Sequence, residues 1–146
     1  MSPKPKTHRH LSKVADWSID QLPGLSHQDQ SQLKAIGITT TGQLLKKAST
    51  PQSRQALAIK LKIKPQYVNK WVALADLARI PTVGCQYCGL LLHAGIASIN
   101  QLAQTPVGRL HQQILRVQVA TMQRRDLCPP VEKIASWIQQ AKEYKE

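Results

Sequence analysis

The chain has 146 residues, of which 42% are hydrophobic and only 4% aromatic, a length that suits one compact domain or two small interlocked ones. A core of Leu, Ile, Val and Ala with three tryptophans and no phenylalanine favours helices over strands. The balance of 20 Lys and Arg against 8 Asp and Glu gives a net charge of +12, which predicts attraction to a polyanion, and the few dispersed acids exclude a two-metal nuclease.

Residues 1–15 are predicted to form a disordered basic arm. They are rich in Pro and basic residues and show no apolar periodicity, so they cannot bury enough surface to offset the entropy of ordering. No apolar stretch follows that suits a signal peptide or a membrane span. Because the three cysteines also fit a reducing compartment, we expect a cytoplasmic protein. The bases of the arm are Lys4, Lys6, Arg9 and Lys13.

Residues 16–79 are predicted to form a first helical unit. Its start and stop signals place helices over residues 27–36, 43–48, 51–61 and 66–79. Ser26 and Thr41 are the expected N-caps of the first two helices, and Gly37 ends the first. The apolar positions of the last helix recur with helical spacing, which predicts a buried face. They are Val68, Trp71, Val72, Leu74, Ala75 and Ala78.

Residues 80–146 repeat the plan of the first unit. The spacing of apolar and glycine residues over 22–44 returns over 80–102, and each half ends on a helix that carries a tryptophan, Trp71 or Trp137. An internal repeat of this size predicts an all-α fold of two pseudo-repeated units packed on a shared core. Four helices are expected in the second unit. The first ends at His93, the second covers 98–105, the third covers 109–125, and the fourth begins after Pro130.

The repeated segments carry a resemblance to a known motif. Residues 22–26 and 80–84, each followed by a helix, resemble the turns of helix-hairpin-helix units. Residues 71–81 and 128–142 resemble a bacterial family, frequent in cyanobacteria, of tandem helix-hairpin-helix proteins that is labelled a domain of unknown function. The resemblance covers residues 18–143. It implies the fold and, for function, only the general tendency of such units to hold a nucleic-acid backbone.

The two hairpin turns are candidates for phosphate contact. Free N–H groups and the helix dipole favour an anion at a helix N-terminus, and glycine lets the anion approach closely. The first turn keeps Gly24 but has Ser26 at the second glycine position, and the second keeps Gly84 but has Thr82 at the first. Hydroxyl groups can still donate to phosphate, so this chemistry is weakened but not lost. The alternative is that both turns only connect packed helices.

A run of unmatched bases lies across the first unit. Between Lys34 and Arg79 the only acid is Asp76, whereas a surface that serves solubility alone normally mixes signs. We expect these bases to bind the phosphates of DNA or RNA without reading the sequence. The bases are Lys46, Lys47, Arg54, Lys60, Lys62, Lys64 and Lys70.

The alternative partner is an acidic protein, which the chain would dock in an interaction or assembly role. Two expectations favour this alternative over nucleic acid. The glycine pairs of both hairpins are incomplete, and we expect no exposed aromatic side chain for stacking on single strands.

Cys85 and Cys88 have the spacing of half a zinc site, to which Cys128 and His93 or His111 could add ligands. A second closely spaced pair is missing, so we expect reduced, metal-free thiols that pack as small apolar groups, in preference to a metal or redox site. The chain has no nucleophile elbow, Walker loop or paired carboxylates on one helix face. It is therefore predicted to be no enzyme and to need no cofactor.

Overall fold

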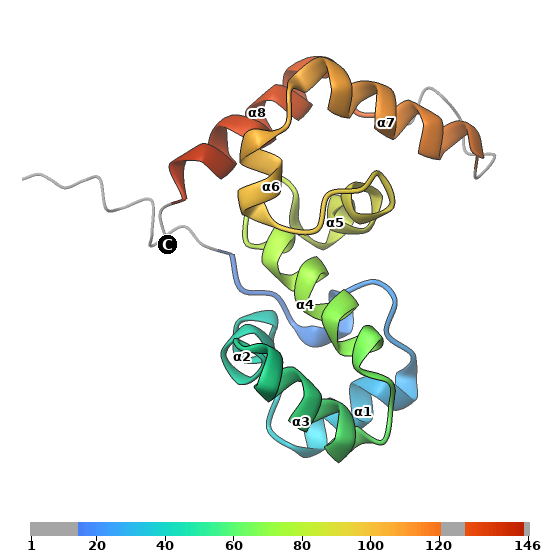
Figure 1. Cartoon of the computed structure of the whole chain (residues 1–146), viewed down its shortest axis with the longest axis vertical. Helices are drawn as coiled ribbons and strands as arrows, with labels where there is room; N and C mark the ends of the chain where they lie inside the picture. The colour runs from blue at the N-terminus through green and yellow to red at the C-terminus, as the bar shows by residue number, and fades with distance from the viewer. Residues whose placement is uncertain (1–14, 121–127, 145–146) are drawn as a thin grey trace, which may run out of the picture.

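Two groups of helices lie one above the other and are joined by a long central helix (Figure 1). The computed structural model describes residues 15–120 and 128–144, and in these ranges it has eight α-helices and no strand. The predicted all-α fold is confirmed. The first group is α1 (His27–Ala35), α2 (Thr41–Lys47) and α3 (Pro51–Leu61), with a 3-10 turn at Ile19–Gln21. The central helix is α4 (Pro65–Ala78), and the second group is α5 (Gly84–His93), α6 (Ile99–Gln104), α7 (Val107–Ala120) and α8 (Val131–Glu143).

The short helices begin at reciprocal side-chain caps. In α1 the Ser26 hydroxyl accepts from the Asp29 N–H at 3.0 Å, as the sequence predicted. The N-cap of α2 is Thr40 and not Thr41, because Gln43 lies three residues after Thr40 and completes a capping box with it. Thr41 is buried instead, and its hydroxyl accepts from a backbone N–H of the segment before α1.

The chain repeats one turn geometry in both halves. Gly37 and Gly95 follow α1 and α5 with φ of 90° and 99°, a left-handed conformation that side chains rarely adopt. After each glycine an N–H returns to the helix, from Ile38 to Leu33 and from Ile96 to Leu91, both at 2.9 Å. The sequence repeat thus corresponds to repeated local structure, while equivalent packing of the two units stays a prediction.

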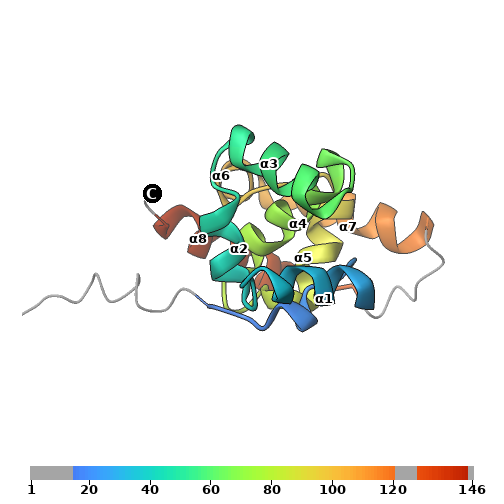
Figure 2. The same cartoon turned by 90° about the horizontal axis from the view of Figure 1, so that it is seen from below.

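The central helix α4 contacts both groups of helices. It packs against α2 and α3 on one side and α5 on the other, and α1, α2 and α3 lie around it in the view along the long axis (Figure 2). All six apolar residues predicted for its buried face are buried. Trp71 in α4 and Trp137 in α8 are 1% and 0% exposed, and the buried residues of both halves belong to one hydrophobic core cluster.

Side chains and backbone from distant parts of the chain meet at the C-terminus of α4. The last carbonyls of a helix have no intrahelical partner. Here the Ala78 carbonyl accepts from Trp17 Nε1 at 2.7 Å. The Arg79 carbonyl accepts from the Ala15 N–H at 3.0 Å and from Tyr144 Oη at 2.8 Å. The end of α4 is therefore held by residues that lie before the first group and after α8.

Helix α7 begins earlier than predicted, whereas α8 begins where it was predicted to. Helix α7 begins at Val107, directly after Pro106 and two residues before the predicted Arg109, and its predicted end near Arg125 lies outside the described residues. The predicted basic arm also lies outside them, apart from Ala15. Helix α8 begins at Val131, immediately after Pro130 as expected.

Candidate nucleic-acid interface

The first hairpin turn is exposed and lies beside a lysine of the central helix. Gly24 has φ +84°, so a side chain there would be strained. A Cβ atom added to Gly24 would lie 3.7 Å from Lys70 Cε and 3.9 Å from Lys70 Nζ. The fold therefore brings together the hairpin glycine and a base of α4, two residues that were predicted as phosphate contacts for different reasons.

A carboxylate already occupies the helix N-terminus behind this turn. Asp29 Oδ2 accepts from the Ser26 N–H at 3.4 Å, and its negative charge opposes the approach of a second anion. The N–H groups of Gly24 and Leu25 donate to no acceptor in the described parts of the chain. At this turn, these two N–H groups and the Lys70 ammonium are available to a phosphate.

The glycine of the second hairpin turn is covered by a tryptophan side chain. Gly84 is buried, its N–H donates to the Ile80 carbonyl at 2.8 Å, and an added Cβ atom would come within 3.0 Å of Trp17 Cζ2. The Trp17 indole thus lies where a phosphate would have to approach. Gly84, predicted as a phosphate contact, therefore offers no open surface to a phosphate. The spacing of the repeat gave no signal for this, because Trp17 precedes the first hairpin in the chain.

The predicted bases of the first unit are accessible and unpaired. All are exposed except Arg54, which is half-buried and donates from Nε to the Ala48 carbonyl at 2.9 Å. The ion pairs within residues 15–120 and 128–144 are Lys34 with Asp20 and Arg79 with Asp76. None of the seven predicted bases takes part in either pair. The four bases of the arm lie outside the described residues.

These seven bases lie in three places. Lys46 and Arg54 line a groove of about 690 Å³ between α2, α4 and the start of α6. Lys47 and Lys60 line a smaller hollow of about 200 Å³ whose other walls include Ile36 and Leu57. The remaining bases, Lys62, Lys64 and Lys70, belong to the turn between α3 and α4 and to the first half of α4.

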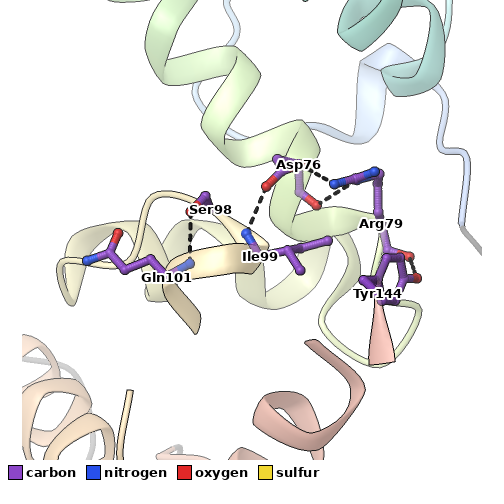
Figure 3. A network of polar contacts seen from close by, with 6 residues as sticks. All are labelled: Asp76, Arg79, Ser98, Ile99, Gln101 and Tyr144. Carbon is purple, nitrogen blue, oxygen red and sulfur yellow. Dashed lines mark hydrogen bonds and ion pairs between the residues drawn. The ribbon is translucent and has the colours of Figure 1, made fainter. Parts of the chain in front are cut away.

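The single acid of this basic run has an internal role. Asp76 Oδ2 accepts from the Ile99 N–H at 2.8 Å, at the start of α6, and Asp76 Oδ1 pairs with the Arg79 guanidinium (Figure 3). The Arg79 guanidinium also lies 5.7 Å from the centre of the Tyr144 ring. Asp76 thus ties α4 to α6, and its charge is neutralised by Arg79. Asp76 forms no ion pair with any of the seven predicted bases.

One exposed aromatic side chain was not predicted from the sequence. No aromatic ring that could stack on a nucleobase was expected, but Tyr67 is 49% exposed in the first turn of α4. This expectation was wrong because α4 extends past the core at its N-terminus, so its apolar face is covered only from Val68 onward. Lysines on both sides, Lys64 and Lys70, were the available signal that the helix surface here faces solvent.

The three cysteines form no disulfide, and all three lie in or against the hydrophobic core. Burial raises the pKa of the Cys85 thiol to about 11, and burial together with the neighbouring Cys85 raises the pKa of Cys88 to about 12. Burial also raises the pKa of Cys128. Within the described ranges no three side chains that bind metals gather in one place. That the thiols are metal-free stays a prediction.

Alkylation of Cys85 should be slow in the folded protein. Only the thiolate reacts, and a pKa raised from 9.0 to about 11 lowers the thiolate fraction on the order of 100-fold at any pH below 9. The rate with iodoacetamide should rise about tenfold per unit between pH 7 and 9, and unfolding in denaturant should remove the protection. Mass spectrometry of quenched time points measures both rates. Equal rates in folded and unfolded protein would contradict the burial of this thiol.

No described helix is both long and apolar enough to cross a bilayer.

Comparison with known proteins identifies a family. Curated proteins and solved structures gave no match. One family model, "Domain of unknown function (DUF4332)", matches residues 23–144, a range that begins in the first hairpin turn and ends at Tyr144 beside the C-terminus of α4. This chain therefore belongs to the DUF4332 family, a domain of unknown function.

Proposed function

We propose that this protein is a non-enzymatic nucleic-acid-binding protein of the cytoplasm that contacts phosphates without reading base sequence. The observation that carries the proposal is the set of seven exposed or half-buried bases of the first unit that form no ion pair in the described residues. The one acid within the run is paired with Arg79. An excess of unpaired cations attracts a polyanion and releases its counterions on binding.

The proposed contacts use two kinds of donor. Lysine ammonium groups supply charge, and the N–H groups of Gly24 and Leu25 beside Lys70 supply short-range hydrogen bonds, as in the first turn of a helix-hairpin-helix unit. Ser26 has a minor part, since its N–H is already bonded to Asp29. The bases of residues 1–13 would extend the contact along the backbone.

The second candidate is docking of an acidic protein surface. Two observations favour it: Gly84 is covered by Trp17, and the Asp29 carboxylate lies at the N-terminus of α1. Both reduce the part that the hairpins can play in phosphate binding. A partner protein would need only the lysine side chains, because carboxylates pair with them without close backbone approach.

Neutralising Lys60, Lys62 and Lys64 together to glutamine should weaken binding to every nucleic-acid sequence by the same factor. The slope of log K against log salt should flatten by about 2–3, because each lost phosphate contact removes roughly one released counterion. Fluorescence anisotropy with labelled oligonucleotides at several salt concentrations measures both. Because all three side chains are exposed, thermal unfolding should stay unchanged.

A matched control removes the same charge from the second unit. Arg109, Arg116 and Lys142 are exposed bases of α7 and α8, and changing all three to glutamine should alter the slope by less than about one. Equal effects of the two triple variants would show that only net charge matters. If the wild-type protein bound no duplex or single strand at low salt, the proposal would be wrong, and an acidic partner would take its place.

A further inference from the structure

Two of the four large apolar side chains exposed in the described residues lie in the basic stretch 59–70. Ile59 is 77% exposed and Tyr67 is 49% exposed; the others are Val119 and Val131, in α7 and α8. Residues 59–70 also hold four of the unpaired lysines. We call residues 59–70 the α3–α4 surface. Contact with phosphates alone requires no exposed apolar groups, so this surface suits a ligand that uses both the lysines and the apolar side chains.

Tyr67 and Lys70 lie on neighbouring turns of α4. Residues three apart on a helix have Cβ atoms about 5–6 Å apart, and the Lys70 ammonium lies beside the Gly24 turn, with its free N–H groups. Lys70 therefore has Tyr67 about one turn before it on α4, and the Gly24 turn with its two N–H donors beside its ammonium. A nucleotide presents matching groups next to each other, a phosphate and a base.

Resting on the proposed function, we infer that the α3–α4 surface binds single-stranded nucleic acid, with Tyr67 stacking against a base while Lys70 and the Gly24 turn hold an adjacent phosphate. An aromatic ring needs the open face of a base, and in a duplex both faces are stacked against neighbouring bases. Tyr67 thus selects single strands over duplexes, whereas the lysines bind both.

An anionic membrane is the other ligand that combines lysines with exposed apolar groups. Binding in the membrane interface needs a helix with a broad apolar face turned outward. The exposed positions of α3 and α4 include both apolar and polar residues: Gln55 and Lys60 accompany Ile59, and Gln66 and Asn69 accompany Tyr67. The mixed character of both helices favours a nucleic acid.

Replacing Tyr67 with alanine tests this inference in the full-length protein. The affinity for a labelled mixed-sequence single strand of 20 nucleotides should fall about 5- to 100-fold at constant salt, the loss expected for one base stacked on an aromatic ring. The affinity for the duplex of the same sequence should change less than about twofold. The salt slope should stay at the wild-type value, because no phosphate contact is lost.

Tyr67→Phe and Tyr67→Leu are the matched controls. The phenylalanine variant keeps the ring and should retain single-strand binding, whereas the leucine variant keeps the apolar volume and should lose it. Equal losses for single strand and duplex, or no loss for either, would overturn the stacking role and leave the proposed function standing. No binding of wild-type protein to either nucleic acid would overturn both. Binding to vesicles of anionic lipid that depends on Tyr67, without a single-strand effect, would replace this inference with a membrane contact.

Discussion

Replacing Trp71 with alanine should lower the free energy of unfolding by about 3–5 kcal/mol. The side chain is 1% exposed in the central helix, which packs against helices of both groups, so its removal leaves a cavity that neither group can close alone. Small domains are stable by only about 5–15 kcal/mol. The loss therefore removes about a fifth of the total at the upper end of this range and most or all of it at the lower end, where little folded protein would remain at 37 °C. Urea unfolding followed by circular dichroism measures it.

A control for this variant lies in the same helix. Tyr67→Ala removes a half-exposed aromatic residue one turn before Trp71, and it should change the free energy of unfolding by less than about 0.5 kcal/mol. If Trp71→Ala cost as little as Tyr67→Ala, α4 would not be the central element of the core.

Replacing Asp76 with alanine should cost about 2–3 kcal/mol, the second largest effect that we expect. The change leaves the half-buried Arg79 without its ion-pair partner and the Ile99 N–H without its acceptor, and hydrogen bonds to charged groups contribute about 1.5–3 kcal/mol each. Asp76→Asn should cost less, because the amide oxygen can still accept from Ile99. The same urea titration measures both variants.

Asp20→Ala is the matched control for Asp76→Ala. Asp20 also pairs with a base, Lys34, but the side chains of this pair are 47% and 44% exposed. Exposed pairs contribute about 0–1 kcal/mol, so the control should be nearly neutral. Equal effects of the two substitutions would mean that Asp76 is an ordinary surface residue and does not tie α4 to α6.

Local features of the fold could be predicted from the sequence. The Ser26 cap, the left-handed glycines at 37 and 95 and the buried face of α4 each depend on residues within one or two turns. Thr40 was missed in favour of Thr41 although Gln43, three residues later, identifies the true cap. Here the signal was present, and the rule for a capping box would have found it.

The candidate site was less predictable because its features depend on tertiary contacts. Nothing near Gly84 in the sequence indicates that Trp17 covers it, and nothing near Asp76 indicates that it caps α6. Six of the seven predicted bases are exposed and Arg54 is half-buried, but their division among two hollows, the turn between α3 and α4 and the first half of α4 follows from how α2, α3 and α4 pack. Charge can be counted from the sequence, whereas its grouping on the surface cannot.

The hydrogen bonds at the C-terminus of α4 also bear on the order of folding. The Trp17 and Tyr144 side chains reach this helix end across 61 and 65 residues of chain, and closing such long loops has an entropic cost that short-range caps avoid. The caps of α1, α2 and α3, which join residues three apart, are therefore expected to form first. The end of α4 is completed only when both flanking segments have docked, so the two halves should gain their full stability in one cooperative step.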